Sequence, residues 1–220
     1  MTLAAVLFDM DGTLVDTEKV WEVALHELAA HYGGVLSPAA RASLVGASSA
    51  TTMRVLGEDL GRADIDVDEG SDWLDNRVIQ LFAEGLLWRP GARELLVEVR
   101  AAGLATALVT NPRRSLVDVA LLTLERANFD VLVCGDEVSA QKPHPDHYLA
   151  ATAALGVDPA RTVAIEDSPI GIASARAAGC VVLGIPNEVA LDGQAGVTLR
   201  PSLLEVDVPL LRALAAGRQG

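Results

Sequence analysis

Short, largely apolar runs of four to six residues recur along this chain, separated by longer amphipathic stretches. Runs without polar alternation are typical of strands buried on both faces, because a strand with one solvated face alternates polar and apolar residues. Such strands in alternation with helices predict an α/β fold: a Rossmann-like parallel sheet core with helices on both faces. The predicted strands are Ala4–Phe8, Ala105–Val109, Val131–Cys134, Thr162–Ile165 and Cys180–Ile185.

Amphipathic stretches between these strands predict helices, and several of them stop at a glycine. Gly103, Gly156 and Gly179 each follow such a stretch, and glycine readily ends a helix. Ligands of open α/β sheets bind beyond the carboxyl ends of the strands, so functional residues are expected there. The predicted helices span 91–102, 113–126, 145–156 and 169–178.

The segment from about 16 to 87 departs from this rhythm, because it has no clear strand. Arg89-Pro90-Gly91 marks the return to strand–helix alternation. We therefore predict an α/β core made of residues 1–15 and 88–220, with residues 16–87 as an all-helical insert. The helices predicted within the insert span 17–32, 38–44, 49–60 and 69–85.

Charge and composition exclude several classes of protein. The 220 residues include 30 acidic and 17 basic ones, a net charge of −13, which disfavours nucleic acid and anionic membranes as partners. No uncharged apolar run approaches the roughly 18 residues of a membrane span. The first apolar run ends at Asp9 without a basic segment ahead of it, so no signal peptide is predicted. Cys134 and Cys180 are expected to be buried free thiols in a reducing cytoplasm, and the oligomeric state stays undecided.

Two carboxylates stand where the first strand ends. Asp9 and Asp11 are two residues apart, which places them on the same side of an extended backbone. Like charges this close need a compensating cation or a shared proton, and oxygen ligands suit Mg²⁺. Gly12 permits a tight turn after the strand. A solvated turn is the alternative interpretation of the bare pair.

Polar residues also close other predicted strands. Thr110-Asn111 follows the second strand, and Glu166-Asp167 follows the fourth, where Asp167 has the alternative role of a helix N-cap. The chain contains only two lysines against fifteen arginines, and Lys142 directly precedes a proline. His144 and His147 are three apart, but no third ligand accompanies them and we predict the start of a surface helix there.

These segments resemble, in the same order, four motifs of the haloacid dehalogenase-like hydrolase superfamily. The matching residues are 9–17, Thr110-Asn111, Lys142-Pro143 and Glu166-Asp167-Ser168. The insert resembles the small helical cap of the β-phosphoglucomutase-like and phosphoglycolate phosphatase-like branch. The resemblance implies hydrolysis of a phosphomonoester.

The resemblance also implies a role for each matched residue. Asp9 would be the nucleophile that forms an aspartyl phosphate, and Asp11 the general acid and base. The Asp9 side chain, the Asp11 carbonyl and the Asp167 side chain would bind Mg²⁺, with Glu166 in a supporting position behind them. Thr110, Asn111 and Lys142 would bind the phosphoryl group, and a cis Lys142–Pro143 bond is implied.

The predicted cap indicates less about the substrate. β-Phosphoglucomutase has a lysine, an arginine and a histidine where this chain has Val45, Ser49 and Trp21, which favours hydrolysis over transfer between two positions of a sugar. A small phosphorylated metabolite, such as a sugar phosphate, is the expected substrate. A sugar phosphomutase and a non-catalytic phosphate-binding protein are the alternatives. Contacts of Trp21, Arg54 and Arg77 with substrate stay open.

Overall fold

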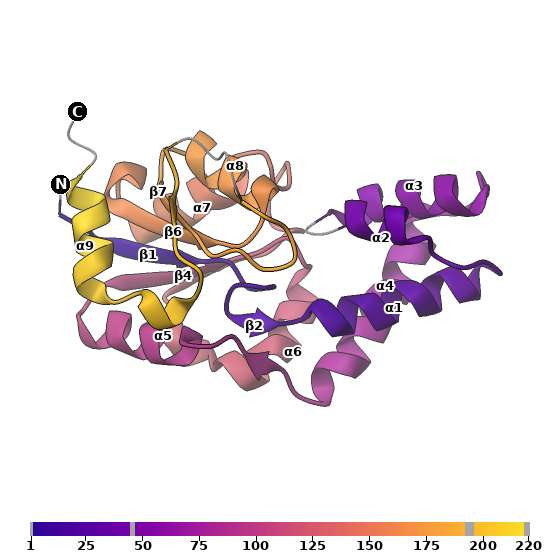
Figure 1. The fold of residues 1–220 in the computed structure, drawn as a ribbon, viewed down its shortest axis with the longest axis horizontal. Helices are drawn as coiled ribbons and strands as arrows, with labels where there is room; N and C mark the ends of the chain where they lie inside the picture. Colours follow the sequence, from indigo (N-terminus) through magenta and orange to yellow (C-terminus); the bar gives the residue numbers. More distant parts are fainter. Residues whose placement is uncertain (1, 45–46, 192–195, 218–220) are drawn as a thin grey trace.

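The computed structural model describes residues 2–44, 47–191 and 196–217. Its sheet has the strand order β5-β4-β1-β6-β7-β8, and every neighbouring pair is parallel (Figure 1). The predicted α/β class is therefore confirmed. The strands are β1 (Ala5–Phe8), β4 (Ala105–Val109), β5 (Val131–Val133), β6 (Thr162–Glu166), β7 (Val181–Gly184) and β8 (Thr198–Leu199).

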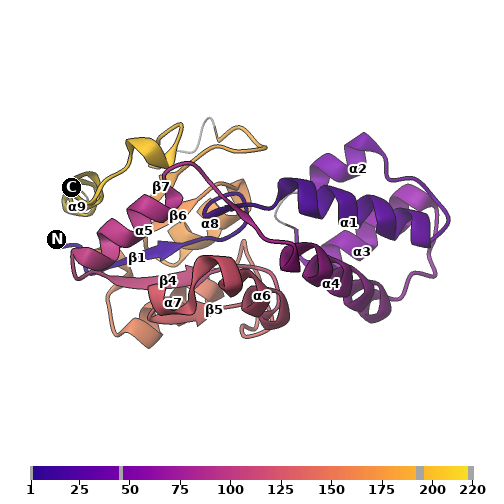
Figure 2. The ribbon, with the colours of Figure 1, turned by 90° about the horizontal axis from the view of Figure 1, so that it is seen from below.

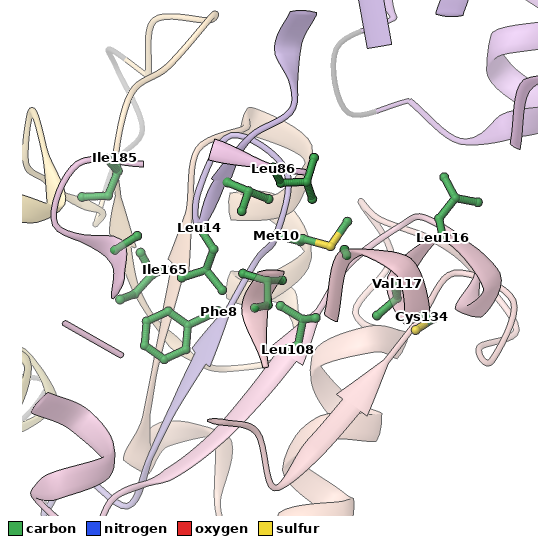
Figure 3. Packing of buried hydrophobic residues seen from close by; sticks show 14 of the residues in the cluster. Phe8, Met10, Leu14, Leu86, Leu108, Leu116, Val117, Cys134, Ile165 and Ile185 are labelled. Atoms are coloured by element: carbon green, nitrogen blue, oxygen red, sulfur yellow. The ribbon is translucent and has the colours of Figure 1, made fainter. Parts of the chain in front are cut away.

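Helices cover both faces of this sheet, as the apolar runs predicted. Val6 and Phe8 pack with one set of helices, while Ala5 and Leu7 pack with the other, and all four are fully buried. Figure 3 shows the first of these layers, with Phe8 beside Leu108 of β4. One face carries α5 (Ala92–Ala101), α6 (Arg114–Leu124) and α9 (Val208–Ala216); the other carries α7 (Asp146–Leu155) and α8 (Pro169–Ala177).

The inserted segment is helical and forms a separate group beyond one end of the sheet (Figure 2). Side chains of Ser37, Ser48 and Asp66 accept hydrogen bonds from the first turns of three of its helices, which explains where those helices begin. The helices are α1 (Glu18–His31), α2 (Pro38–Ser43), α3 (Ser49–Leu60) and α4 (Val67–Ala83).

The expectation of no strand within residues 16–87 is wrong at both ends of that segment. β2 (Val15–Asp16) pairs antiparallel with β3 (Leu87–Trp88) and joins the outgoing chain to the returning one. Strands of two residues are too short to show a hydrophobic period, which is why the sequence did not indicate them. The sequence analysis also missed β8 and α9 near the C-terminus.

Short 3₁₀ turns complete the secondary structure, at η1 (Arg126–Asn128), η2 (Pro159–Arg161) and η3 (Leu203–Glu205). Cys134 and Cys180 are both buried, as expected, and neither forms a disulfide within the described part of the chain. Within the described ranges, no helix combines the length and the apolar character needed to cross a bilayer.

Candidate active site

The carboxyl ends of neighbouring strands bring the predicted site residues together. Asp9 follows β1, Thr110 follows β4, and Glu166 ends β6, and these three strands are adjacent in the sheet. The backbone N–H of Asp9 donates to the carbonyl of Ile165 at 3.1 Å, which extends the β1–β6 pairing to the site. Lys142 reaches the same place from the segment before α7, and its bond to Pro143 is cis, as the sequence analysis expected.

The turn after β1 is tight, and its glycine has a steric reason. The N–H of Gly12 donates to the carbonyl of Val15 at 2.9 Å, and Gly12 has a positive φ of 72°. A Cβ at this position would lie 2.0 Å from Oδ2 of Asp167 and 2.7 Å from Nδ2 of Asn187. Glycine therefore lets the backbone approach the end of β6, a closeness that any side chain would prevent.

Lys142 joins two of the carboxylates. Its Nζ donates to Oδ1 of Asp9 at 2.7 Å, to Oε1 of Glu166 at 2.6 Å and to the carbonyl of Val109 at 2.9 Å. Burial by itself lowers the pKa of Lys142, but the charges of Asp9 and Glu166 outweigh it and hold that pKa above its usual range. The ammonium therefore stays charged, and all three of its protons are engaged.

Glu166 is fully buried and held on several sides. Besides Lys142, the hydroxyl of Tyr148 donates to its Oε1 at 2.6 Å, and the hydroxyl of Ser168 donates to its Oε2 at 3.3 Å. A Cβ on Gly171 of α8 would lie 2.0 Å from Oε2. The sequence analysis missed Tyr148, because an aromatic residue on a helix usually signals only core packing.

The acidic groups present a donor set that fits a hard divalent cation. Asp9, Glu166 and Asp167 each offer a carboxylate oxygen, and these oxygens lie within 4.8 Å of one another. Burial raises the pKa of Asp9 to about 8, against the lowering effect of Lys142, and burial followed by the charge of Asp9 raises the pKa of Asp167. Three carboxylates beside one ammonium leave an excess of negative charge that a cation such as Mg²⁺ would neutralise.

The alternative role of Asp167 as a helix cap is wrong. The N-cap of α8 is Ser168, whose hydroxyl accepts from the N–H of Gly171 at 3.1 Å. The neighbouring carboxylate of Asp167 is thus left to face the acidic cluster rather than the helix. Ser and Asp are both favoured caps, so the sequence alone could not choose between adjacent residues.

Asp11 is positioned by residues from the beginning of the insert. Its Oδ1 accepts from the hydroxyl of Thr17 at 2.7 Å and from the indole N–H of Trp21 at 3.0 Å. Its Oδ2 accepts from the hydroxyl of Thr110 at 3.4 Å. Burial raises the pKa of Asp11, and the hydrogen bonds from Trp21 and Thr17 oppose that rise. The carboxyl therefore has a fixed orientation, and its pKa lies above the usual carboxyl range.

Asn111 and His147 have surroundings that the sequence did not indicate. The side-chain oxygen of Asn111 accepts from the N–H of Lys142 at 3.2 Å, while α6 begins only at Arg114, whose N–H donates to Asp136 at 2.9 Å. His147 is fully buried on the inner face of α7, while Leu149 of the same helix is exposed, so α7 lies at the surface but His147 points into the protein. Burial and then the charge of Lys142 lower the pKa of His147 to about 4.

A cavity between the sheet and the insert opens onto this site. Trp21 lines it, whereas Arg54 and Arg77 are not among its lining residues and pair instead with Glu58 and Glu27. Val45 lies outside the described residues. Lining residues that the sequence analysis did not single out include Arg41, Leu44, Thr52, Leu74, Asp75, Asn187 and Glu188.

Comparisons with known proteins agree with this geometry. A family model described as haloacid dehalogenase-like hydrolase matches residues 3–179. The protein CbbY of Rhodobacter capsulatus is 36% identical over 198 residues, which cover 86% of this chain and 87% of that protein. The phosphorylated carbohydrates phosphatase of Thermotoga maritima is 34% identical over 179 residues, 80% of this chain and 82% of that protein.

A solved structure is similar over nearly the whole chain. CbbY from Rhodobacter sphaeroides, crystallised in complex with xylulose 1,5-bisphosphate, is 28% identical and superposes with a TM-score of 0.83, covering 95% of this chain and 99% of that one. The family match spans most of the sequence and includes the strand ends that carry Asp9, Thr110 and Glu166. The chain therefore belongs to the haloacid dehalogenase-like hydrolases, in their β-phosphoglucomutase-like branch.

Proposed function

We propose that the protein is a Mg²⁺-dependent phosphomonoester hydrolase that acts on a small phosphorylated metabolite, such as a sugar phosphate. Residues 1–15 and 88–220 would form its catalytic core and residues 16–87 its cap. The observation that carries this proposal is the placement of Asp9. Its carboxylate is bound by Lys142, lies within the acidic cluster and lines the cavity beneath the insert.

Asp9 would act as the nucleophile. Its Oδ1 is bound to Lys142, so its second oxygen would attack phosphorus. A bond forms between that oxygen and phosphorus as the ester P–O bond breaks, and the product is an aspartyl phosphate. Water then attacks the same phosphorus, which releases inorganic phosphate and restores the Asp9 carboxylate. The covalent step divides one difficult displacement into two easier ones.

Asp11 would move the protons in both steps. Its protonated carboxyl would donate to the leaving alkoxide, and the resulting carboxylate would accept a proton from the attacking water. Burial raises its pKa, which favours a protonated form that can act as the acid. Thr17 and Trp21 hold one of its oxygens and so fix the direction of transfer.

Thr110 and Asn111 would bind the phosphoryl oxygens from the side of β4, and Lys142, whose three protons are already engaged, would attract them by its positive charge. The side chains of Asp9 and Asp167, with the carbonyl of Asp11, would hold Mg²⁺, and Glu166 would support them from behind. When bound, Mg²⁺ would neutralise charge on the transferring group. Since Glu166 already binds Lys142 and Tyr148, its main contribution would be to orient the lysine.

The alternatives are less well supported. A phosphomutase must hold a second phosphate while the sugar turns over, and Ser49 lines the cavity without a charge. Arg41 is the cation that the described part of the insert adds to the cavity wall, and it already pairs with Glu188. A binding protein without turnover would have no need of two separately positioned carboxylates. The phosphatase from Thermotoga maritima supports hydrolysis of a phosphorylated carbohydrate by analogy.

The experiment is phosphate release from a panel of phosphomonoesters, with Mg²⁺ and with chelator, beside the Asp9→Asn variant. The panel includes β-glucose 1-phosphate, 2-deoxyglucose 6-phosphate and phosphoglycolate. The proposal expects Mg²⁺-dependent release that the variant abolishes. Conversion of β-glucose 1-phosphate to glucose 6-phosphate without net release would identify a mutase. Tight phosphate binding with no turnover of any ester would identify a binding protein.

A further inference from the structure

Tyr148 is a buried polar side chain at the active site that none of the proposed chemical steps uses. It stands in the first turn of α7, on the segment that also carries Lys142. Its side chain is fully buried and does not line the cavity, so it has no access to a substrate. It belongs to the apolar cluster on one face of the sheet, with Ala107, Val109 and Ala164, which leaves its ring little freedom.

Both ends of this side chain act on the ion pair between Lys142 and Glu166. The hydroxyl donates to Oε1 of Glu166 at 2.6 Å, the same oxygen that accepts from Nζ of Lys142 at 2.6 Å. The ring centroid lies 5.3 Å from that Nζ, within the range of a cation–π contact. Burial, and then the charge of Glu166, raise the pKa of the Tyr148 hydroxyl above its usual value, so the hydroxyl keeps its proton and remains a donor.

The carboxylate of Glu166 could serve either Lys142 or a divalent cation. One of its oxygens lies within 4.8 Å of carboxylate oxygens of Asp9 and Asp167, so Glu166 is part of the acidic cluster that fits a hard cation. Glu166 is also one of the three acceptors that fix the direction of the Lys142 ammonium. If Glu166 turned to the cation, Lys142 would lose that acceptor and would be held less firmly on Asp9.

Hydrogen bonds to both oxygens of Glu166 decide between these two roles. A carboxylate oxygen offers about two lone-pair sites, and Lys142 and Tyr148 fill both sites of Oε1. The hydroxyl of Ser168 donates to Oε2, which lies against Gly171 of α8. Oε1 therefore has no lone pair to offer a cation while both of its donors are in place.

We propose that Tyr148 is a positioning residue of the hydrolase: its hydroxyl keeps the Glu166 carboxylate on Lys142 and out of the metal ligands, so that the ammonium stays aimed at Asp9. Tyr148 acts through Glu166 and touches neither substrate nor metal. The proposal rests on the proposed hydrolase function, and it adds a residue that lies outside the four matched sequence motifs.

Tyr148→Phe tests the proposal, because phenylalanine keeps the ring beside Lys142 and removes only the hydroxyl. The variant loses a buried hydrogen bond to a charged group, so kcat for an ester that the unaltered protein hydrolyses should fall about tenfold. KM should change by less than about twofold, because the cavity wall and the phosphoryl-binding residues are untouched. Urea unfolding verifies that the variant is folded under the conditions of the assay.

Mg²⁺ binding in the absence of ester, measured by calorimetry, is the second readout. Once released by Tyr148, Glu166 can join Asp9 and Asp167, and a further carboxylate ligand should tighten Mg²⁺ binding about threefold or more. Loss of a purely structural hydrogen bond would not strengthen binding of the metal. This readout needs no turnover, so it tests the role of Tyr148 even if no ester of the panel is hydrolysed.

Tyr32→Phe is the matched control, since Tyr32 and Tyr148 are the two tyrosines of the chain. The hydroxyl of Tyr32 has no hydrogen-bond partner among the described residues, and Tyr32 lies at the end of α1, outside the lining of the cavity. Its kcat and its Mg²⁺ affinity should equal those of the unaltered protein.

A second background tests whether Tyr148 acts through Glu166. In Glu166→Gln the hydroxyl meets an uncharged amide, so adding Tyr148→Phe should lower kcat by less than about threefold. A loss of the same size in both backgrounds, a kcat of Tyr148→Phe within about twofold of the unaltered protein, or an unchanged Mg²⁺ affinity would overturn the proposal. Each of these results would leave the hydrolase function intact, because Mg²⁺-dependent release by the unaltered protein is measured in the same assay.

Discussion

Replacing Lys142 by methionine removes the ammonium that joins Asp9 to Glu166, and the expected effect on stability depends on pH. Both carboxylates are buried, and Lys142 contacts them at 2.7 and 2.6 Å. Removal of one partner from a buried ion pair costs about 3–5 kcal/mol, because the remaining charge is left uncompensated. We expect Lys142→Met to lower the free energy of unfolding by this amount at pH 8.5 and to abolish phosphate release.

The loss should be smaller at pH 5.5. The pKa of Asp9 is about 8 with Lys142 present, and removal of the lysine's charge raises it further. A carboxyl whose pKa is higher in the folded chain than in the unfolded chain binds its proton more tightly when folded. The free energy of unfolding therefore falls as the pH rises from the pKa of the unfolded chain, which is in the usual carboxyl range, to the higher pKa of the folded chain. Below the usual carboxyl range the group is protonated in both states and costs no stability.

Urea unfolding in chelator at the two pH values measures both effects. The other lysine of the chain provides a matched control, because Lys19 is exposed at the start of α1. Lys19→Met should change the free energy of unfolding by less than about 0.5 kcal/mol at either pH. Equal stabilities of the two variants at both pH values would refute the reasoning about the buried pair.

Other substitutions test separate parts of the site. Gly171→Ala should destabilise the fold and reduce kcat, because the added Cβ would lie 2.0 Å from Glu166. This is opposite to the usual preference of about 1 kcal/mol for alanine over glycine in a helix, and urea unfolding and phosphate release measure it. His147→Gln should weaken the loss of stability on acidification. The pKa of His147 is about 4 in the folded chain against 6.5 for the free side chain, so on acidification the unfolded chain gains this proton first. The free energy of unfolding therefore falls by about 2 kcal/mol by pH 5 in the unaltered protein. An equal dependence of unfolding free energy on pH in His147→Gln would contradict this. Trp21→Phe keeps the ring but removes the N–H bound to Asp11, so kcat should fall about tenfold with little change in unfolding midpoint.

The strands were predictable because burial on both faces leaves a local signature. β1, β4 and β6 read as apolar runs, and the residues after them converge because parallel strands end at one edge of the sheet. The same reasoning placed Asp9, Thr110 and Glu166 near one another, and the structure brings them together.

Features that depend on distant contacts were not predictable. Arg41 and Glu188 are 147 positions apart, and nothing local marks either as a partner of the other. Tyr148 looks like a core aromatic until its hydroxyl is seen to donate to Glu166. The β2–β3 pair brings together two-residue segments from either end of a long insert, a contact without a periodic signal.

Direct detection of the covalent intermediate tests the central claim. The protein is mixed with Mg²⁺ and a turned-over phosphomonoester, quenched in acid within the first turnovers, and digested for mass spectrometry. The account predicts the added mass of one phosphoryl group on the peptide that contains Asp9, removable by mild base and absent from Asp9→Asn. Turnover of the same ester without any phosphorylated Asp9 peptide, or with Asp9→Asn still active, would contradict it.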